Sequence, residues 1–252
     1  MSKQFDQKVV LITGAGSGIG RATALAFGRE GAKVAVAEIV EKDGLETVAR
    51  IEAAGGVARF FKVNVTQAAE VEQLVQQVVG AWGRLDILHN NAGVTNESAT
   101  ITETSEAEFD RVIAINLKGV WLCMKYAIAQ MLKQGGGVVI NTASALSFRV
   151  LAGSSAYIAT KHAVAGLTKT GAVEYGGQNI RINAVCPGVI KTPLLENLPN
   201  AAELEKSLIE LHPIGRLGTG DDVANCVLWL ASDQASFVHG ALISVDGGWV
   251  AQ

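Results

Sequence analysis

The feature that most constrains the fold is a regular alternation of short, apolar, β-branched runs with longer helical patterns. This rhythm predicts βαβ units, in which the strands lie parallel and helices cover the sheet. The strands are expected at residues 9–13, 33–37, 58–63, 85–89, 138–142, 180–185 and 242–245. The helices are expected at residues 19–30, 41–54, 68–82, 106–133, 155–175 and 221–231.

No linker, internal repeat or low-complexity segment interrupts this alternation. The 252 residues are therefore predicted to form one α/β domain over 1–252, a Rossmann-like, doubly wound parallel sheet of about seven strands with helices on both faces. One segment, at about 188–214, is rich in proline and leucine. It is predicted to be a substrate lid, with a packed helical excursion as the alternative.

Composition excludes several classes of function. The net charge of −3, with scattered Lys and Arg, disfavours a nucleic-acid partner. The three cysteines are far apart, which suits reduced thiols in a cytoplasmic protein, and the four histidines have no metal-ligand spacing, so no metal site is expected. The polar N-terminus and the lack of a run of roughly 18 to 20 apolar residues predict no membrane segment.

A glycine-rich turn follows the first predicted strand and opens the first helix. Its glycines are Gly14, Gly18 and Gly20 in the pattern G-x-x-x-G-x-G, which differs from G-x-G-x-x-G. Glycines at such a turn let backbone N–H groups approach a pyrophosphate at the positive end of the helix. The position between strand and helix favours a dinucleotide site over a simple sharp turn.

Glu38 ends the second predicted strand, eighteen residues after Gly20. A carboxylate here can accept hydrogen bonds from both hydroxyls of the adenosine ribose. It also repels the extra phosphate of NADP by roughly 1 to 4 kcal/mol at contact distance. Because Ile39 supplies no guanidinium for that phosphate, we expect NAD as the cofactor, unless Glu38 is only a solvated charge.

Tyr157 and Lys161 lie four residues apart at the start of a predicted helix and share a face. An ammonium beside a phenol favours the phenolate, so we expect the pKa of Tyr157 to lie below its ordinary value. Ser144 follows the fifth strand, at the edge of the sheet where ligands bind, and its hydroxyl can hold a substrate oxygen. Asn116 interrupts an otherwise apolar helix, where its amide needs a polar partner.

These residues resemble the motifs of the short-chain dehydrogenase/reductase family over nearly the whole chain. The resemblance is carried by the glycine turn, Asn90-Asn91-Ala92-Gly93, Asn116, Ser144, Tyr157-x-x-x-Lys161, Pro187-Gly188 and Val245-Asp246-Gly247-Gly248. It implies a catalytic set of Asn116, Ser144, Tyr157 and Lys161, with Tyr157 as general acid/base and Lys161 on the nicotinamide ribose. In this reading Asn116 keeps a water in a proton relay to Lys161.

The resemblance also implies the cofactor contacts. These are Gly14, Ser17, Gly18, Ile19, Gly20, Glu38, Asn64, Val65, Asn91, Ala92, Gly93, Tyr157, Lys161, Pro187, Gly188, Ile190 and Thr192. Two of them depart from the commonest family pattern: Glu38 replaces Asp with the charge kept, and Asn64 replaces an Asp that meets adenine, a role its amide oxygen can still fill. A homotetramer or homodimer is implied as well.

The leading hypothesis is hydride transfer between NAD and a secondary alcohol or ketone, acting on CH–OH groups, with Tyr157 moving the proton. The alternatives are a non-catalytic cofactor-binding regulator or scaffold, an NADP-dependent ketoreductase, and epimerisation or dehydration on the same scaffold. The substrate is expected to be small and apolar or cyclic, because apolar side chains follow Ser144; they would equally suit core or a subunit interface. Among them, Arg149 is either a contact for an anionic group or a solvated charge.

Overall fold

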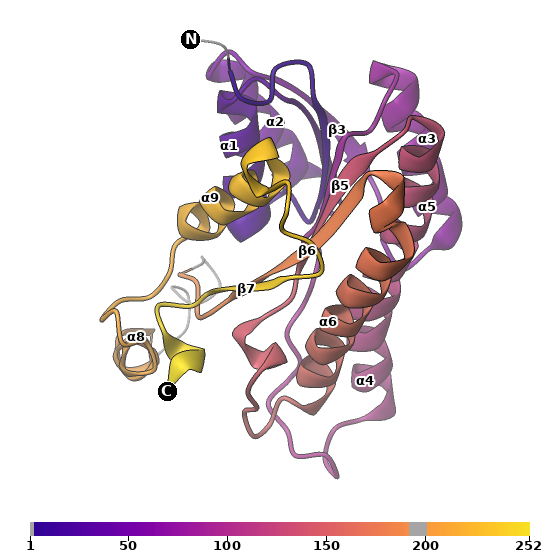
Figure 1. Cartoon of the computed structure of the whole chain (residues 1–252). Helices are drawn as coiled ribbons and strands as arrows, with labels where there is room; N and C mark the ends of the chain where they lie inside the picture. Colours follow the sequence, from indigo (N-terminus) through magenta and orange to yellow (C-terminus); the bar gives the residue numbers. More distant parts are fainter. Residues whose placement is uncertain (1–2, 192–200) are drawn as a thin grey trace.

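The computed structural model describes residues 3–191 and 201–252, and within them it contains a seven-stranded parallel sheet (Figure 1). The strand order is β3-β2-β1-β4-β5-β6-β7, and each neighbouring pair is parallel. The strands are β1 (Val9–Thr13), β2 (Lys33–Glu38), β3 (Val57–Lys62), β4 (Ile87–Asn90), β5 (Gly137–Thr142), β6 (Ile180–Pro187) and β7 (Leu242–Val245). The order reverses beside β1, which confirms the doubly wound topology predicted from the sequence.

Helices cover both faces of this sheet (Figure 1). One face carries α1 (Gly18–Arg29), α2 (Glu41–Ala53) and α9 (Gly220–Ala231), and the other carries α3 (Ala68–Trp82), α5 (Val120–Lys133) and α6 (Ser155–Tyr175). Each layer has its own apolar core, because alternate residues of every strand point to opposite faces. Leu11 and Leu88 belong to the α3/α5/α6 core, while Ile12 and Ile87 belong to the other.

Strand β4 begins later than the sequence predicts. The expected strand started at Leu85, but β4 begins at Ile87. Gln134 explains the difference, because its side-chain oxygen accepts from the backbone N–H of Leu85 at 3.1 Å and its amide donates to the carbonyl of Leu85 at 2.7 Å. The Gln134 side chain thus binds the backbone N–H and the carbonyl of Leu85, which in a strand would pair with a neighbouring strand.

The helix predicted at 106–133 is continuous but changes its winding. It consists of α4 (Glu106–Ile113), a π-helical segment η1 (Ala114–Gly119) and α5. Wider π turns of this kind often mark functional sites. Asn116 lies inside η1, so the predicted polar interruption is also the point where the winding changes.

The remaining short elements lie at the two edges of the sheet. The elements η2 (Ala145–Ser147), α8 (Ala201–Glu210) and η5 (Trp249–Ala251) follow the carboxyl ends of β5, β6 and β7, whereas η3 (Gly176–Gln178) and η4 (Asp233–Ala235) precede the amino ends of β6 and β7. The predicted lid at 188–214 includes α8, but residues 192–200, and with them Thr192, lie outside the described residues. The family contact expected for Thr192 therefore stays a prediction.

Candidate active site

The turn between β1 and α1 is built for close approach to another backbone. Gly14 has a φ of +63°, and a Cβ there would stand 2.8 Å from the Cα of Ala92. A Cβ at Gly20 would collide with the carbonyl of Gly14 and would lie 2.6 Å from the side-chain nitrogen of Asn91. The N-cap Ser17 makes no side-chain capping bond, so the first N–H groups of α1 are free of a cap. This cradle fits the pyrophosphate of a dinucleotide.

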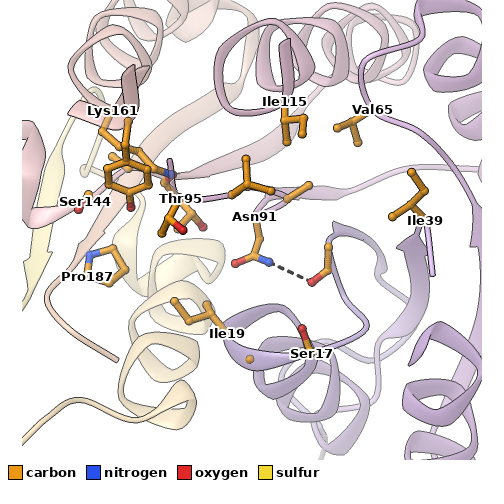
Figure 2. Close-up of a pocket in the computed structure, with 18 of the residues that line it drawn as sticks. Ser17, Ile19, Ile39, Val65, Asn91, Thr95, Ile115, Ser144, Lys161 and Pro187 are labelled. Carbon is orange, nitrogen blue, oxygen red and sulfur yellow. Dashed lines mark hydrogen bonds between the residues drawn. The ribbon is translucent and has the colours of Figure 1, made fainter. Parts of the chain in front are cut away.

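Asn91 joins this turn to the end of β4. Its side-chain nitrogen donates to the carbonyls of Thr13, at 3.2 Å, and Gly14, at 3.1 Å. The hydroxyl of Thr13 accepts in return from the backbone N–H groups of Asn91 and Ala92, both at 3.1 Å. The Asn-Asn-Ala-Gly motif thus holds the glycine turn in shape, and Asn91 lies centrally in the cavity between Ser17 and Ile115 (Figure 2).

Glu38 lies at the glycine turn between β1 and α1, and its contact with the ribose stays a prediction. One carboxylate oxygen accepts from the backbone N–H of Gly16 at 3.0 Å, and the other accepts from Ile39 at 2.8 Å and Val40 at 3.2 Å. The carboxylate therefore reaches the glycine turn itself. These donors orient it, as expected for a group that receives ribose hydroxyls.

Asn64 lines the same cavity, but its amide oxygen is engaged within the chain. It accepts from the backbone N–H of Thr66 at 3.1 Å and from the Thr66 hydroxyl at 2.8 Å. An amide oxygen has two lone pairs, and these two donors use both. In the ligand-free chain Asn64 therefore binds Thr66, and its contact with adenine stays a prediction.

A cavity of about 780 Å³ connects the cofactor turn with the predicted catalytic residues. Figure 2 shows Ile39 and Val65 at one end and Ser144, Lys161 and Pro187 at the other. Of the predicted contacts, the cavity is lined by Gly14, Ser17, Gly18, Ile19, Glu38, Asn64, Val65, Asn91, Ala92, Gly93, Ser144, Tyr157, Lys161, Pro187, Gly188 and Ile190. Gly20 and Asn116 do not line the cavity but contact residues that do: Gly20 packs against the carbonyl of Gly14, and Asn116 binds Val94.

The cavity also has lining residues that the sequence analysis did not assign. They are Ala37, Ile39, Val63, Val94, Thr95, Arg111, Ile115, Thr142 and Ala143. Most of them are sequence neighbours of a predicted contact at a strand end, and this proximity was the one signal that could have identified them as lining residues. Arg111 is the exception: it precedes Ile115 by one helical turn, and its guanidinium donates to the carbonyl of Thr95 at 3.0 Å.

Tyr157, Lys161 and Ser144 meet at the end of the cavity near β5. The hydroxyl of Ser144 hydrogen-bonds the Tyr157 side chain and accepts from the backbone N–H of Leu146 at 3.1 Å. Nζ of Lys161 donates to the carbonyl of Thr142 at 2.8 Å and lies 5.4 Å from the centre of the Tyr157 ring. The phenol, the ammonium and a second hydroxyl therefore lie together, with Ser144 and Lys161 buried and Tyr157 partly buried.

Burial dominates the ionisation of this group. It raises the pKa of Tyr157, although the hydrogen bond from Ser144 works in the opposite direction. Burial also lowers the pKa of Lys161 to about 8. The expected lowering of the Tyr157 pKa is therefore wrong for the ligand-free chain, because loss of water outweighs the neighbouring groups.

Asn116 is 1% exposed and has the polar partner that its position demands. Its side-chain oxygen accepts from the backbone N–H of Val94 and its nitrogen donates to the carbonyl of Val94, both at 2.8 Å. The same nitrogen lies 3.4 Å from the hydroxyl of Thr160. Through these hydrogen bonds Asn116 connects Val94, in the loop after β4, with Thr160 of α6.

The apolar residues that follow Ser144 separate into two groups. Leu146 is buried in a small cluster with Trp249 of η5, against which Tyr157 and Val189 also pack. Phe148, Val150 and Leu151 are exposed. Leu146 is therefore core beside Tyr157, whereas none of the others, nor Arg149, lines the cavity.

Metal binding and membrane insertion are two functions that the sequence disfavours. Within residues 3–191 and 201–252, no group of three or more His, Cys, Asp or Glu side chains could hold a metal ion. The helix Glu106–Lys133 is long and apolar enough to cross a membrane by length and composition. Half of its most apolar window is buried inside the structure, which is typical of a core helix.

Residues 14–250 match the family model described as enoyl-(acyl carrier protein) reductase. The chain belongs to the short-chain dehydrogenase/reductase family of oxidoreductases, whose members bind a nicotinamide dinucleotide. It is 45% identical over 248 residues to an uncharacterized oxidoreductase of Thermotoga maritima, covering 97% of this chain and 98% of that protein. It is 42% identical over 253 residues to the cyclohexanol dehydrogenase of an Acinetobacter species, covering 100% and 98%.

Solved structures agree with this assignment. The crystal structure of levodione reductase superposes with a TM-score of 0.94 at 38% identity, covering 98% of this chain and 99% of that one. A candidate 2-deoxy-D-gluconate 3-dehydrogenase from Agrobacterium tumefaciens, with bound NADP, superposes with a TM-score of 0.90 at 35% identity, covering 100% and 99%. These likenesses confirm the single Rossmann-like fold.

Proposed function

We propose that this chain is an NAD-dependent dehydrogenase that interconverts a small, cyclic or otherwise apolar secondary alcohol and its ketone. The observation that carries the proposal is one cavity with the Glu38 carboxylate at the glycine turn and Ser144, Tyr157 and Lys161 at its other end. The names of two relatives, a cyclohexanol dehydrogenase and a levodione reductase, support a cyclic substrate. The apolar cluster of Leu146 and Trp249 beside Tyr157 suits the same class.

When bound, NAD would supply the acceptor for the hydride of the carbinol carbon, and the residues at the end of the cavity would handle the proton. Tyr157 takes the hydroxyl proton, and Ser144 donates a hydrogen bond that holds the substrate oxygen beside the phenol. The ammonium of Lys161 stabilises the phenolate across a site with little water. Asn116 holds the loop after β4, which forms one wall of the cavity.

Glu38 supports NAD over NADP, and Arg21 adds to the case. The guanidinium of Arg21, on α1, donates to the hydroxyl of Thr47 at 3.0 Å and forms an ion pair with Glu46 at 3.2 Å. The charge of Arg21 is therefore already paired with Glu46, and the side chain of Ile39 carries no charge that could bind the extra phosphate of NADP. The NADP bound to the Agrobacterium relative keeps an NADP-dependent ketoreductase as the second candidate.

We further propose a single catalytic domain over 1–252 with a substrate lid at 188–214. The three free thiols support a cytoplasmic location. Three exposed large apolar side chains on α4, α5 and α6, those of Phe109, Trp121 and Val173, support assembly into a homotetramer or homodimer. Light scattering on the purified protein tests the oligomeric state, and a monomer would refute this part.

A kinetic panel tests the activity. The purified protein is assayed with NAD or NADP against cyclohexanol, cyclic diols, sugar alcohols and hydroxy acids, by absorbance of the reduced nicotinamide. We expect cyclic secondary alcohols with NAD to give the highest kcat/KM. Equal efficiency with NADP would refute the role of Glu38, and binding of NAD without turnover of any alcohol or ketone would favour the scaffold alternative.

Tyr157→Phe tests the chemistry, with Tyr175→Phe as the matched control at the other end of α6. We expect Tyr157→Phe to lower kcat by roughly 10²- to 10⁴-fold and to leave NAD binding intact. The Tyr175→Phe variant should retain the wild-type kcat. Retained turnover in Tyr157→Phe would refute the proposed mechanism.

A further inference from the structure

The first turn of α6, which carries Tyr157, has no cap of its own. The side chain of its N-cap residue, Ser154, makes no capping hydrogen bond. The backbone N–H of Tyr157, at the third position of the helix, is one of the donors that the helix leaves without a partner. Such donors are ordinarily satisfied by the N-cap side chain.

Asn96 supplies this cap from 61 residues away. Its side-chain oxygen accepts from the backbone N–H of Tyr157 at 3.2 Å. Its amide nitrogen donates to the carbonyl of Gly153 at 2.9 Å and to that of Glu97 at 2.6 Å. Asn96 therefore connects the residue before the N-cap with the catalytic residue itself.

The carbonyl of Tyr157 is held as well. It accepts from the hydroxyl of Thr160 at 2.7 Å, and that hydroxyl lies 3.4 Å from the amide nitrogen of Asn116. Because Asn116 also binds both backbone groups of Val94, two residues before Asn96, the contacts form a closed circuit. The backbone of Tyr157 is thus fixed at its N–H by Asn96 and at its carbonyl by Thr160.

We propose that Asn96 and Thr160 are positioning residues that set the place of the Tyr157 phenol for proton transfer. The inference rests on the proposed function and extends it to two residues that the family motifs do not mark. Neither residue lines the cavity, so both act through the backbone of Tyr157. A displacement of about 1 Å at a reacting group can cost roughly 10²-fold in rate.

The experiment compares Asn96→Ala and Thr160→Val with two controls. Thr160→Ser keeps the hydroxyl that binds the Tyr157 carbonyl, and Thr102→Ala removes an exposed side chain from the loop of Asn96, outside the circuit. We expect Asn96→Ala and Thr160→Val to lower kcat by roughly 10- to 100-fold. The KM for NAD and the NAD affinity measured by tryptophan fluorescence should remain within about twofold of wild type, and both controls should retain the wild-type kcat.

Hydrogen exchange of the Tyr157 amide provides a readout that does not depend on activity. Asn96→Ala should accelerate this exchange, and Thr160→Ser should not. A kcat within twofold of wild type in both Asn96→Ala and Thr160→Val would overturn the inference, as would equal losses of kcat and NAD affinity, which would indicate general damage. If Tyr157→Phe is inactive while these variants are fully active, only this inference fails; if Tyr157→Phe is active, the proposed function fails.

Discussion

The ammonium of Lys161 lies over the ring of Tyr157, 5.4 Å from its centre, and donates its hydrogen bond to the carbonyl of Thr142 rather than to the phenol. Burial acts on both side chains, raising the pKa of the phenol and lowering that of the ammonium to about 8. The two shifts have one cause, because each disfavours the charged form in a site with little water. Once the phenol ionises, the phenolate of Tyr157 and the ammonium of Lys161 therefore stabilise each other by their opposite charges.

The first prediction concerns the pH dependence of alcohol oxidation. The rate should rise with pH throughout the range below the raised pKa of Tyr157, because the ionised fraction of the phenol grows as pH rises. The ammonium of Lys161 is present below its pKa of about 8 and favours that ionisation. In Lys161→Met the rate should therefore fall most below pH 8, measured as kcat at saturating NAD from about pH 6 to pH 10. An equal loss of rate at every pH would contradict the assigned role of the lysine.

The second prediction concerns cofactor choice. Glu38→Ser removes the charge that opposes the extra phosphate of NADP, a repulsion of roughly 1 to 4 kcal/mol. The ratio of kcat/KM with NADP to that with NAD should rise roughly 10-fold or more in this variant. Glu38→Asp, which keeps the charge, should retain the preference for NAD. If Glu38→Ser and wild type show the same ratio, another group selects the cofactor.

The third prediction compares two glycines. Gly20→Ala places a methyl group against the carbonyl of Gly14 and the side chain of Asn91, so cofactor affinity should fall at least roughly 10-fold. Gly80→Ala, in α3, meets open space and should stabilise the protein by roughly 0.5 to 1 kcal/mol through helix propensity. NAD titration and thermal unfolding of both variants provide the measurements. Wild-type affinity in Gly20→Ala would show that the turn is not the cofactor cradle.

The fourth prediction concerns stability in acid and rests on His89, a fully buried residue of β4 whose ring nitrogen hydrogen-bonds the Thr142 hydroxyl at 2.9 Å. Burial lowers the pKa of His89 from 6.5 to about 3. Between these values the unfolded chain binds a proton that the folded chain does not, so stability falls as pH drops below 6.5. This group alone contributes a slope of about 1.4 kcal/mol per pH unit.

His89→Val removes that titration. Its free energy of unfolding, measured by chemical denaturation from about pH 4 to pH 8, should fall less steeply in acid than that of wild type. Above pH 7 the two curves should run parallel, because the histidine is neutral in both states there. Equal slopes below pH 6.5 would show that His89 is not the group responsible.

Much of the fold and of the site followed from local pattern. Residues 9–13, 68–82, 155–175 and 242–245 have the predicted bounds, because period-two and period-3.6 apolar patterns are local properties of the chain. The candidate site residues line one cavity for a related reason. Glycines, Glu38, Ser144 and Tyr157 follow strand ends or open helices, and the carboxyl ends of parallel strands meet at one edge of the sheet.

Long-range contacts decided what the pattern did not show. The Gln134 side chain binds Leu85, so β4 begins two residues later than predicted, and Asn96 caps the helix that carries Tyr157. Each is a hydrogen bond between a side chain and a backbone group, and its geometry exists only after the chain has folded. Where such a partner comes from a distant segment, its position in the sequence carries no signal.

The sequence by itself determined that this chain builds a parallel sheet with a glycine turn after its first strand, and it predicted which residues would carry the proton chemistry. The tertiary structure alone decided how those residues are held and charged. The π turn at Asn116 and the shifted pKa values of Tyr157 and Lys161 belong to that second group. The physical reason is that burial and long-range hydrogen bonding depend on the whole packed molecule, whereas periodicity and turn chemistry depend only on neighbours along the chain.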